Sequence, residues 1–222
     1  MDRQRDTRSR VDLAPRFWQL GLVVPDIEAA ADELERGPAM TFQELQQLTL
    51  GADRLLVQLS VVGPPYLELL QGDSGGPWDA GGRPRLDHLG YWVDDRAAER
   101  ARLAEAGFAA IDYAASAAHY HVLPRTGLRV EPIDTHQRDR LRRAFGFEQL
   151  DGWSPQAPRD VAIPVKDLAV AQAELSEALY LQWDASDGGF ASEQGPPHVS
   201  LTDGGRPRLI YATGPAVEIA TA

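Results

Sequence analysis

The chain of 222 residues contains no cysteine. That absence excludes a disulfide framework, thiolate metal ligands and cysteine nucleophiles, and it is compatible with a reducing compartment. No apolar run approaches the ~18 to 20 residues that a membrane-spanning helix needs. The arginines at positions 3, 5, 8, 10 and 16 are not followed by the apolar segment of a secretory signal. We therefore expect a cytoplasmic protein with no membrane partner, whose residues 1–15 form a flexible arm.

Basic residues are also few. The chain has 22 Lys and Arg against 33 Asp and Glu, a formal net charge of −11 and a pI near 4.9. Nucleic acids and anionic surfaces are bound by clustered Lys and Arg, so this balance argues against a nucleic-acid partner. The hydrophobic share of 43% is enough to fill a core in one large domain or two small ones.

What the sequence does contain is a strand-then-helix pattern that occurs three times. Each copy opens with a short β-rich run, passes an aspartate placed as a helix N-cap, and continues with Ala, Glu and Leu at helical spacing. The copies are residues 17–37, 86–108 and 159–180, and their aspartates are Asp26, Asp95 and Asp167. The first two copies end at Gly37 and Gly107, where a glycine typically ends a helix.

Further β-rich runs follow each helix, so the first two units read β-α-β-β-β and the third is a shorter version. This pattern predicts an α+β fold made of tandem modules. We expect paired modules in residues 16–134 (16–72 and 86–134), a linker in residues 135–158, and a third, degenerate module in residues 159–222.

The repeat resembles the vicinal oxygen chelate superfamily in its VVPD at 23–26 and WVDD at 92–95. That superfamily includes glyoxalase I, methylmalonyl-CoA epimerase, extradiol dioxygenases, and fosfomycin and bleomycin resistance proteins. The stretches PPYLELLQG and LDHLGYWVDD are most similar to its glyoxalase-like branch. The similarity is good over residues 15–135 and poor over residues 159–212. It implies two modules that pair into an open, curved mixed sheet around one divalent metal ion, and a homodimer is frequent among such proteins.

Four residues fall on the superfamily's metal-ligand positions. The resemblance implies Gln19 and His88 as ligands from the first strand of each module, and Glu68 and Glu131 from the last. One imidazole nitrogen with several oxygens suits Zn²⁺, Ni²⁺, Co²⁺, Mn²⁺ or Mg²⁺ rather than a soft metal, and the identity of the ion stays open. Gln19 is the weakest member of the set because an amide is neutral.

The alternation of a strand gives physical support for this assignment. Glu68 lies between Leu67 and Leu69, so its side chain points to the face opposite both. A carboxylate that faces a core is costly unless it is paired or bound to a metal. Glu68 and Glu131 can equally be outward residues of half-exposed strands, and without the resemblance that interpretation would stand.

The third module departs from the pattern, because Asp160 stands where Gln19 stands and Ser200 stands where Glu68 stands. We expect no second metal site there. The unit could cover a sheet edge, extend the pocket or mediate dimerisation.

The resemblance implies a metal-dependent isomerase or lyase that acts on a small carbonyl, acid, thioester or natural product through a metal-stabilised enolate. Glu131 or Glu68 would serve as the general base. The alternative is a non-catalytic ligand-binding or resistance protein of the same fold, which has no need of four metal ligands. An extradiol dioxygenase presents two histidines and one carboxylate to iron, and Gln19 in place of a histidine disfavours it.

Overall fold

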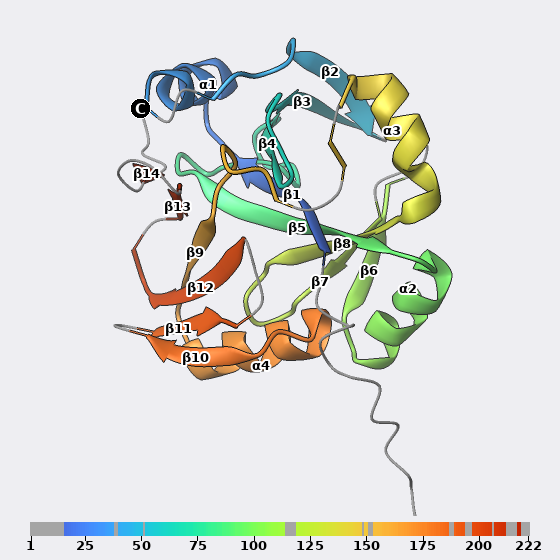
Figure 1. Cartoon of the computed structure of the whole chain (residues 1–222), viewed down its shortest axis with the longest axis vertical. Helices are drawn as coiled ribbons and strands as arrows, with labels where there is room; N and C mark the ends of the chain where they lie inside the picture. The colour runs from blue at the N-terminus through green and yellow to red at the C-terminus, as the bar shows by residue number, and fades with distance from the viewer. Residues whose placement is uncertain are drawn as a thin grey trace, which may run out of the picture.

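Two β-sheets and four α-helices make up the described part of the chain in a computed structural model (Figure 1). The structure describes residues 16–37, 40–50, 52–113, 119–147, 149–150, 153–186, 189–193, 197–205, 207–211 and 217–218. The predicted flexible arm of residues 1–15 lies outside them. The predicted α+β fold class is confirmed, because helices and strands alternate along the chain and the strands form mixed sheets, the larger with eight strands.

The eight-stranded sheet contains the same strand arrangement twice. The first copy has β1 (Arg16–Val23), α1 (Ile27–Arg36), β2 (Gln46–Leu50), β3 (Asp53–Leu59) and β4 (Tyr66–Gly72). The second copy has β5 (Arg85–Val93), α2 (Arg96–Glu105), β6 (Ala109–Asp112), β7 (His119–Val122) and β8 (Arg129–Asp134). The strand order is β2-β3-β4-β1-β5-β8-β7-β6, so the two copies join where β1 and β5 pair antiparallel. In each copy the first and last strands, β1 with β4 and β5 with β8, run parallel.

The aspartates at the helix starts act as the sequence predicts. Asp26, Asp95 and Asp167 have extended backbones, and each accepts a hydrogen bond from the backbone N–H three residues on. Such caps satisfy one of the free N–H groups of the first helical turn, and each contributes ~1 kcal/mol to helix stability. This cap fixes the direction in which each helix leaves the strand before it.

The third unit builds a six-stranded sheet of its own, in the order β10-β11-β12-β9-β13-β14. Its elements are β9 (Asp160–Val165), α4 (Leu168–Leu179), β10 (Trp183–Ser186), β11 (Gly189–Ser192), β12 (His198–Asp203), β13 (Arg208–Ile210) and β14 (Val217–Glu218). The sequence pattern predicts strands near β10, β12 and β13 but misses β11 and β14. Figure 1 shows β9 to β12 and α4 together on one side of the molecule.

One hydrophobic cluster joins the two sheets. It contains Leu20 and Leu22 of β1 and Leu89 of β5, together with Val199 and Leu201 of β12. Gln19 and Gly21 alternate with these leucines, so they face the opposite side of the sheet. The third unit therefore packs on the face away from the predicted ligands. The division of the chain into modules at the expected boundaries stays a prediction.

The predicted linker contains a short 3₁₀ turn, η2 (Thr135–Gln137), and a helix, α3 (Arg138–Phe145). Leu141 and Phe145 of this helix pack against an aromatic cluster that includes Trp18 and Trp92. Hydrogen bonds hold the chain that follows: Trp92 Nε1 donates to the carbonyl of Leu150 at 2.9 Å, and the Tyr66 hydroxyl donates to the carbonyl of Gln149. No helix among the described residues is long and apolar enough to cross a membrane.

Candidate metal centre

Strand register brings the four predicted ligands together. Glu68 of β4 and His88 of β5 both pair with Gly21 of β1, on its two sides. Gln19 of β1 and Glu131 of β8 likewise both pair with Gly90 of β5. Each pair of ligands thus flanks a glycine on the strand between them, and the two glycine positions lie on adjacent strands at the centre of the sheet.

The two glycines make room for the ligand side chains. A Cβ atom at Gly21 would overlap the His88 ring, and one at Gly90 would lie 2.5 Å from Cγ of Gln19. Neither glycine has a positive φ, so space and not backbone conformation requires them. Sequence reasoning missed both, although each stands two residues after a predicted ligand in the two related strands.

Four polar side chains converge at this point. Nε2 of Gln19 lies 2.8 Å from Oε2 of Glu131, 2.9 Å from Nε2 of His88 and 3.4 Å from Oε2 of Glu68. Nε2 of His88 lies 3.1 Å from Oε2 of Glu68 and 3.7 Å from Oε2 of Glu131. Gln19, His88 and Glu131 are buried, and the side chain of Glu68 is 15% exposed.

Neither protonation state of His88 satisfies all the hydrogen-bonding groups of this cluster. If Nε2 of His88 is unprotonated, it accepts from the Gln19 amide but its lone pair faces a carboxylate oxygen of Glu68. If it is protonated, it donates to Glu68 but its hydrogen competes with those of the Gln19 amide. The Gln19 amide nitrogen has two hydrogens for three neighbouring acceptors while Nε2 of His88 is unprotonated, and it faces another N–H group once Nε2 is protonated. Neither protonation state of His88 therefore satisfies every contact in the cluster.

The same set fits a divalent cation in both chemistry and spacing. Ligand distances of about 2.0–2.2 Å place neighbouring donor atoms about 2.8–3.6 Å apart in tetrahedral or octahedral geometry. The separations within this cluster run from 2.8 to 3.7 Å. The amide of Gln19 would present its oxygen in place of its nitrogen, an exchange that a half-turn of the amide makes. No group of three His, Cys, Asp or Glu side chains in the described part of the chain stands ready to hold an ion.

The buried carboxylate of Asp87 contacts Nδ1 of His88, the ring nitrogen that faces away from the cluster. The consecutive residues Gly21 and Leu22 of β1 pair with His88 and Leu86 of β5, so Asp87 between them has no partner and is the extra residue of a β-bulge. Its side chain therefore lies beside His88. Oδ2 of Asp87 is 3.2 Å from Nδ1 of His88, and Arg85 and Arg129 bind its carboxylate at 2.5 and 3.3 Å. This bond fixes the tautomer that leaves Nε2 facing the cluster.

Burial and charge shift the pKa values of these groups. Burial favours neutral His88, but the hydrogen bonds that its ring donates to Asp87 and Glu68 outweigh this and raise the pKa of His88 to about 10. Burial also raises the pKa of Asp87, but His88 and the two arginines outweigh it, so the pKa of Asp87 is lowered. Burial raises the pKa of Glu131 to about 7, against the opposing charge of His88. A cation in the cluster would displace these protons.

The cluster forms one wall of a cavity of about 200 Å³. Gln19, Glu68 and Glu131 line it, and so do Leu141 and Phe145 of α3, which covers this side of the sheet. The remaining walls are mainly apolar side chains of β2, β3 and β4. Polar groups at one end of a small apolar cavity are typical of a site for a small molecule.

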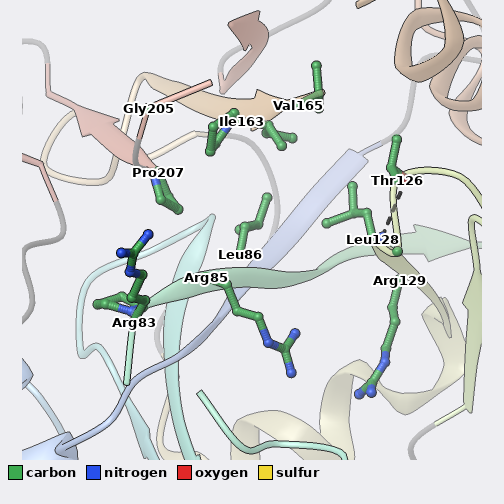
Figure 2. Close-up of a pocket in the computed structure, with 13 residues that line it drawn as sticks. Arg83, Arg85, Leu86, Thr126, Leu128, Arg129, Ile163, Val165, Gly205 and Pro207 are labelled. Atoms are coloured by element: carbon green, nitrogen blue, oxygen red, sulfur yellow. Dashed lines mark hydrogen bonds between the residues drawn. The ribbon is translucent and has the colours of Figure 1, made fainter. Parts of the chain in front are cut away.

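A second and larger cavity, of about 620 Å³, lies between the two sheets (Figure 2). Leu86 and Leu128 face Ile163 and Val165 across it, while the guanidinium groups of Arg85 and Arg129 extend the other way. None of the four predicted ligands lines this cavity. Its walls come from the first sheet and from the third unit.

The third unit contributes nothing to the polar cluster among the described residues. Asp160 and Ser200 lie in β9 and β12 at the positions that match Gln19 and Glu68, as the sequence register predicts. Neither residue lines the cavity beside the cluster. Nδ1 of His198 bonds instead to the carbonyl of Ser192.

Comparison with known proteins finds a family model that matches the first two units. Residues 18–123 match the family model of the Glyoxalase/Bleomycin resistance protein/Dioxygenase superfamily. The match includes Gln19, Glu68 and His88 and ends before Glu131. No curated protein matches the chain.

Solved structures share the fold at low identity. A mutant of 4-hydroxymandelate synthase from Streptomyces coelicolor is similar with a TM-score of 0.57 and 13% identity, over 86% of this chain and 63% of that one. The chain thus spans less than two thirds of that enzyme. A hypothetical protein from Staphylococcus aureus is similar with a TM-score of 0.55 and 8% identity, over 85% of this chain and 86% of that one. Methylmalonyl-CoA epimerase from Mycobacterium tuberculosis has a TM-score of 0.44 and 18% identity, over 55% and 89% of the two chains.

Proposed function

Since residues 18–123 belong to the glyoxalase/bleomycin resistance protein/dioxygenase superfamily, we propose that the chain is a metal-dependent isomerase or lyase. Gln19, Glu68, His88 and Glu131 would hold one divalent ion of the Zn²⁺, Ni²⁺, Co²⁺, Mn²⁺ or Mg²⁺ class. The observation that carries the proposal is the convergence of these four side chains, 2.8–3.7 Å apart, in the wall of a cavity. Neither protonation state of His88 satisfies all of the contacts among them.

A bound divalent ion would supply Lewis-acid stabilisation of negative charge that develops on a substrate oxygen. The protein supplies the proton acceptor. The carboxylates of Glu131 and Glu68 both line the cavity, and either can take a proton from a substrate carbon next to a carbonyl and return it. His88 is held by Asp87 and does not reorient during such a transfer. Leu141 and Phe145 of α3 limit access of water to the cavity.

Hydrogen exchange on candidate substrates tests this proposal. Metal-loaded protein is incubated in D₂O with α-hydroxyketones, 2-oxo acids and acyl-CoA thioesters, and NMR follows loss of the proton next to the carbonyl. We expect exchange with at least one class, reduced about 10²- to 10⁴-fold in Glu131→Gln or Glu68→Gln, because a general base contributes that much. Asp160→Ala, outside the cavity, serves as the control and should exchange at the wild-type rate.

The competing function is a ligand-binding protein of the same superfamily. Metal-loaded protein that binds members of the panel but exchanges no proton would contradict the enzyme proposal and favour this alternative.

A further inference from the structure

The cavity beside the polar cluster has one cationic side chain in its wall. Arg96 is the first residue of α2, directly after the N-cap Asp95, and it lines the cavity together with Glu131. Among the described residues the side chain of Arg96 makes no hydrogen bond and no ion pair. It is only partly exposed. A guanidinium with five donors, half-buried at a cavity and left unbonded, is available to a ligand.

The neighbouring arginines differ in this respect. Arg100 and Arg102 of the same helix pair with Asp112 and Glu99 at 2.8 and 2.7 Å. Arg85 and Arg129 pair with Asp87. Arg96 alone of this group faces the cavity without a carboxylate partner in the described part of the chain. These four arginines thus each have a carboxylate at ion-pair distance, whereas Arg96 has none in the described part of the chain and acts on Glu131 only at longer range.

The indole of Trp18 adds a second free donor. Trp18 is 3% exposed and lines the cavity, and its Nε1–H has no hydrogen-bond partner among the described residues. Trp92, whose ring lies 5.2 Å from that of Trp18, does find a partner for its own Nε1–H. A buried donor without a partner costs free energy in the ligand-free state, and a ligand oxygen in the cavity would relieve that cost.

Charge balance indicates what kind of ligand the cavity takes. The two carboxylates of Glu68 and Glu131 would balance the two charges of a divalent ion. The charge of Arg96 then remains, in a cavity whose other walls include Val57, Leu70 and Ile133. A single positive charge in apolar surroundings favours one negative charge on the ligand, because little water is there to screen the pair.

We propose that the substrate of this site is a small monoanion with an apolar body, whose anionic group pairs with Arg96 while its carbonyl oxygens face the four-residue cluster. Trp18 Nε1–H offers one further hydrogen bond to a ligand oxygen. The inference rests on the proposed function, since it specifies the substrate class of the same site.

Two hydroxamic acids of matched length test the inference by calorimetry on metal-loaded protein. Both carry the same metal-chelating head. The monohydroxamate of adipic acid ends in a carboxylate, and heptanohydroxamic acid ends in an ethyl group. We expect the anionic probe to bind more tightly than the neutral one. Arg96→Gln should weaken the anionic probe about 10- to 100-fold, the range for a hydrogen bond to a charged group, and change the neutral probe less than about 2-fold.

Matched variants separate the outcomes. Arg100→Gln removes an arginine from the same helix but outside the cavity and should leave both affinities unchanged. Arg96→Lys keeps the charge and should restore most of the preference for the anionic probe. If Arg96→Gln keeps its metal and the preference persists, the monoanion inference is overturned while the proposed function stands. If wild-type protein holds no metal and binds neither probe, both are overturned.

Discussion

The polar cluster depends on residues that carry no functional group. Gly21 and Gly90 stand where any side chain would occupy the space of His88 or Gln19. Because both glycines have ordinary extended backbones, alanine there is compatible with the strand but not with the ligand. At the scale of single residues, the cluster therefore requires the space left by these two glycines as well as its four polar side chains.

We predict that Gly21→Ala removes metal binding while the protein stays folded. The new methyl group overlaps the buried His88 ring, and overpacking of this kind costs about 1–3 kcal/mol. Circular dichroism would report the fold, and metal titration would report the site. Gly37→Ala is the matched control, because its Cβ would lie at an ordinary 3.4 Å from its nearest neighbour. Wild-type metal affinity in Gly21→Ala would contradict the role given to this glycine.

Much of this cluster could be predicted from the sequence, for a physical reason. Gln19, Glu68, His88 and Glu131 are the positions that the resemblance to the superfamily implies. Strand alternation agrees with them, because side chains alternate along strands and a repeated module can place its equivalent residues on one face. Asp87 does not follow from it, because alternation puts it on the opposite face from His88. Only the bulge in the pairing of β1 with β5 turns it beside the ring, and a bulge depends on the partner strand. That the four residues bind a metal stays a prediction.

At the scale of elements, α2 is tied to the sheet and to the third unit through Glu99. Its carboxylate accepts from the Tyr91 hydroxyl at 2.6 Å and from Arg102 at 2.7 Å. Arg102 donates in turn to the carbonyls of Glu177 and Ala178 near the end of α4. Burial works against the ionised carboxyl, but the bonds to Arg102 and Tyr91 outweigh it and lower the pKa of Glu99.

This lowered pKa predicts a pH-dependent contribution to stability. A carboxyl whose pKa is lower in the folded state stabilises the fold above its unfolded pKa of about 4.3 and loses that contribution as pH falls through the folded value. Glu99→Gln should therefore lower the free energy of unfolding by about 1–3 kcal/mol at pH 7. The difference from wild type should shrink as the pH falls from 5 to 3.5.

Urea unfolding at several pH values measures this difference, with Glu105→Gln as a control on an exposed position of the same helix. A difference that stays constant from pH 7 to pH 3.5 would contradict the role of the ionised carboxylate.

The contact of helix α3 with the cavity could not be predicted from the sequence. The sequence predicts a linker in residues 135–158, and Arg140, Arg142 and Arg143 of this helix are exposed. Its other face, with Leu141 and Phe145, lines the cavity. A helix of eight residues holds too few apolar positions for its pattern to predict a partner, so this contact becomes visible only in the folded chain.

At the scale of the whole molecule, the third unit supports the fold from the side opposite the cluster. Glu174 of α4 is buried, and its carboxylate accepts from the backbone N–H of Arg125 at 2.8 Å and of Thr126 at 3.0 Å. These bonds cap the turn between β7 and β8, which leads to Glu131. Among its described residues the third unit thus has none in the polar cluster, but its Glu174 binds the turn that leads into the strand of Glu131.

We predict that Glu174→Ala destabilises the protein without removing a metal ligand. Two part-buried backbone N–H groups would lose a charged acceptor, which costs about 1–3 kcal/mol. Thermal or urea unfolding would measure the loss, and metal stoichiometry at 20 °C should stay at the wild-type value. Glu177→Ala, exposed on the same helix, should change neither quantity. A lost metal in folded Glu174→Ala would instead show that the third unit shapes the site directly.

The most direct test of the central claim is elemental analysis of the protein purified without chelator, beside His88→Ala and Asp160→Ala. The proposed site predicts about one divalent metal per chain in the wild type and in Asp160→Ala, and none in folded His88→Ala. Equal metal content in all three proteins would contradict the assignment of the ligands. No metal in the wild type, and none taken up on titration, would contradict the metal centre itself.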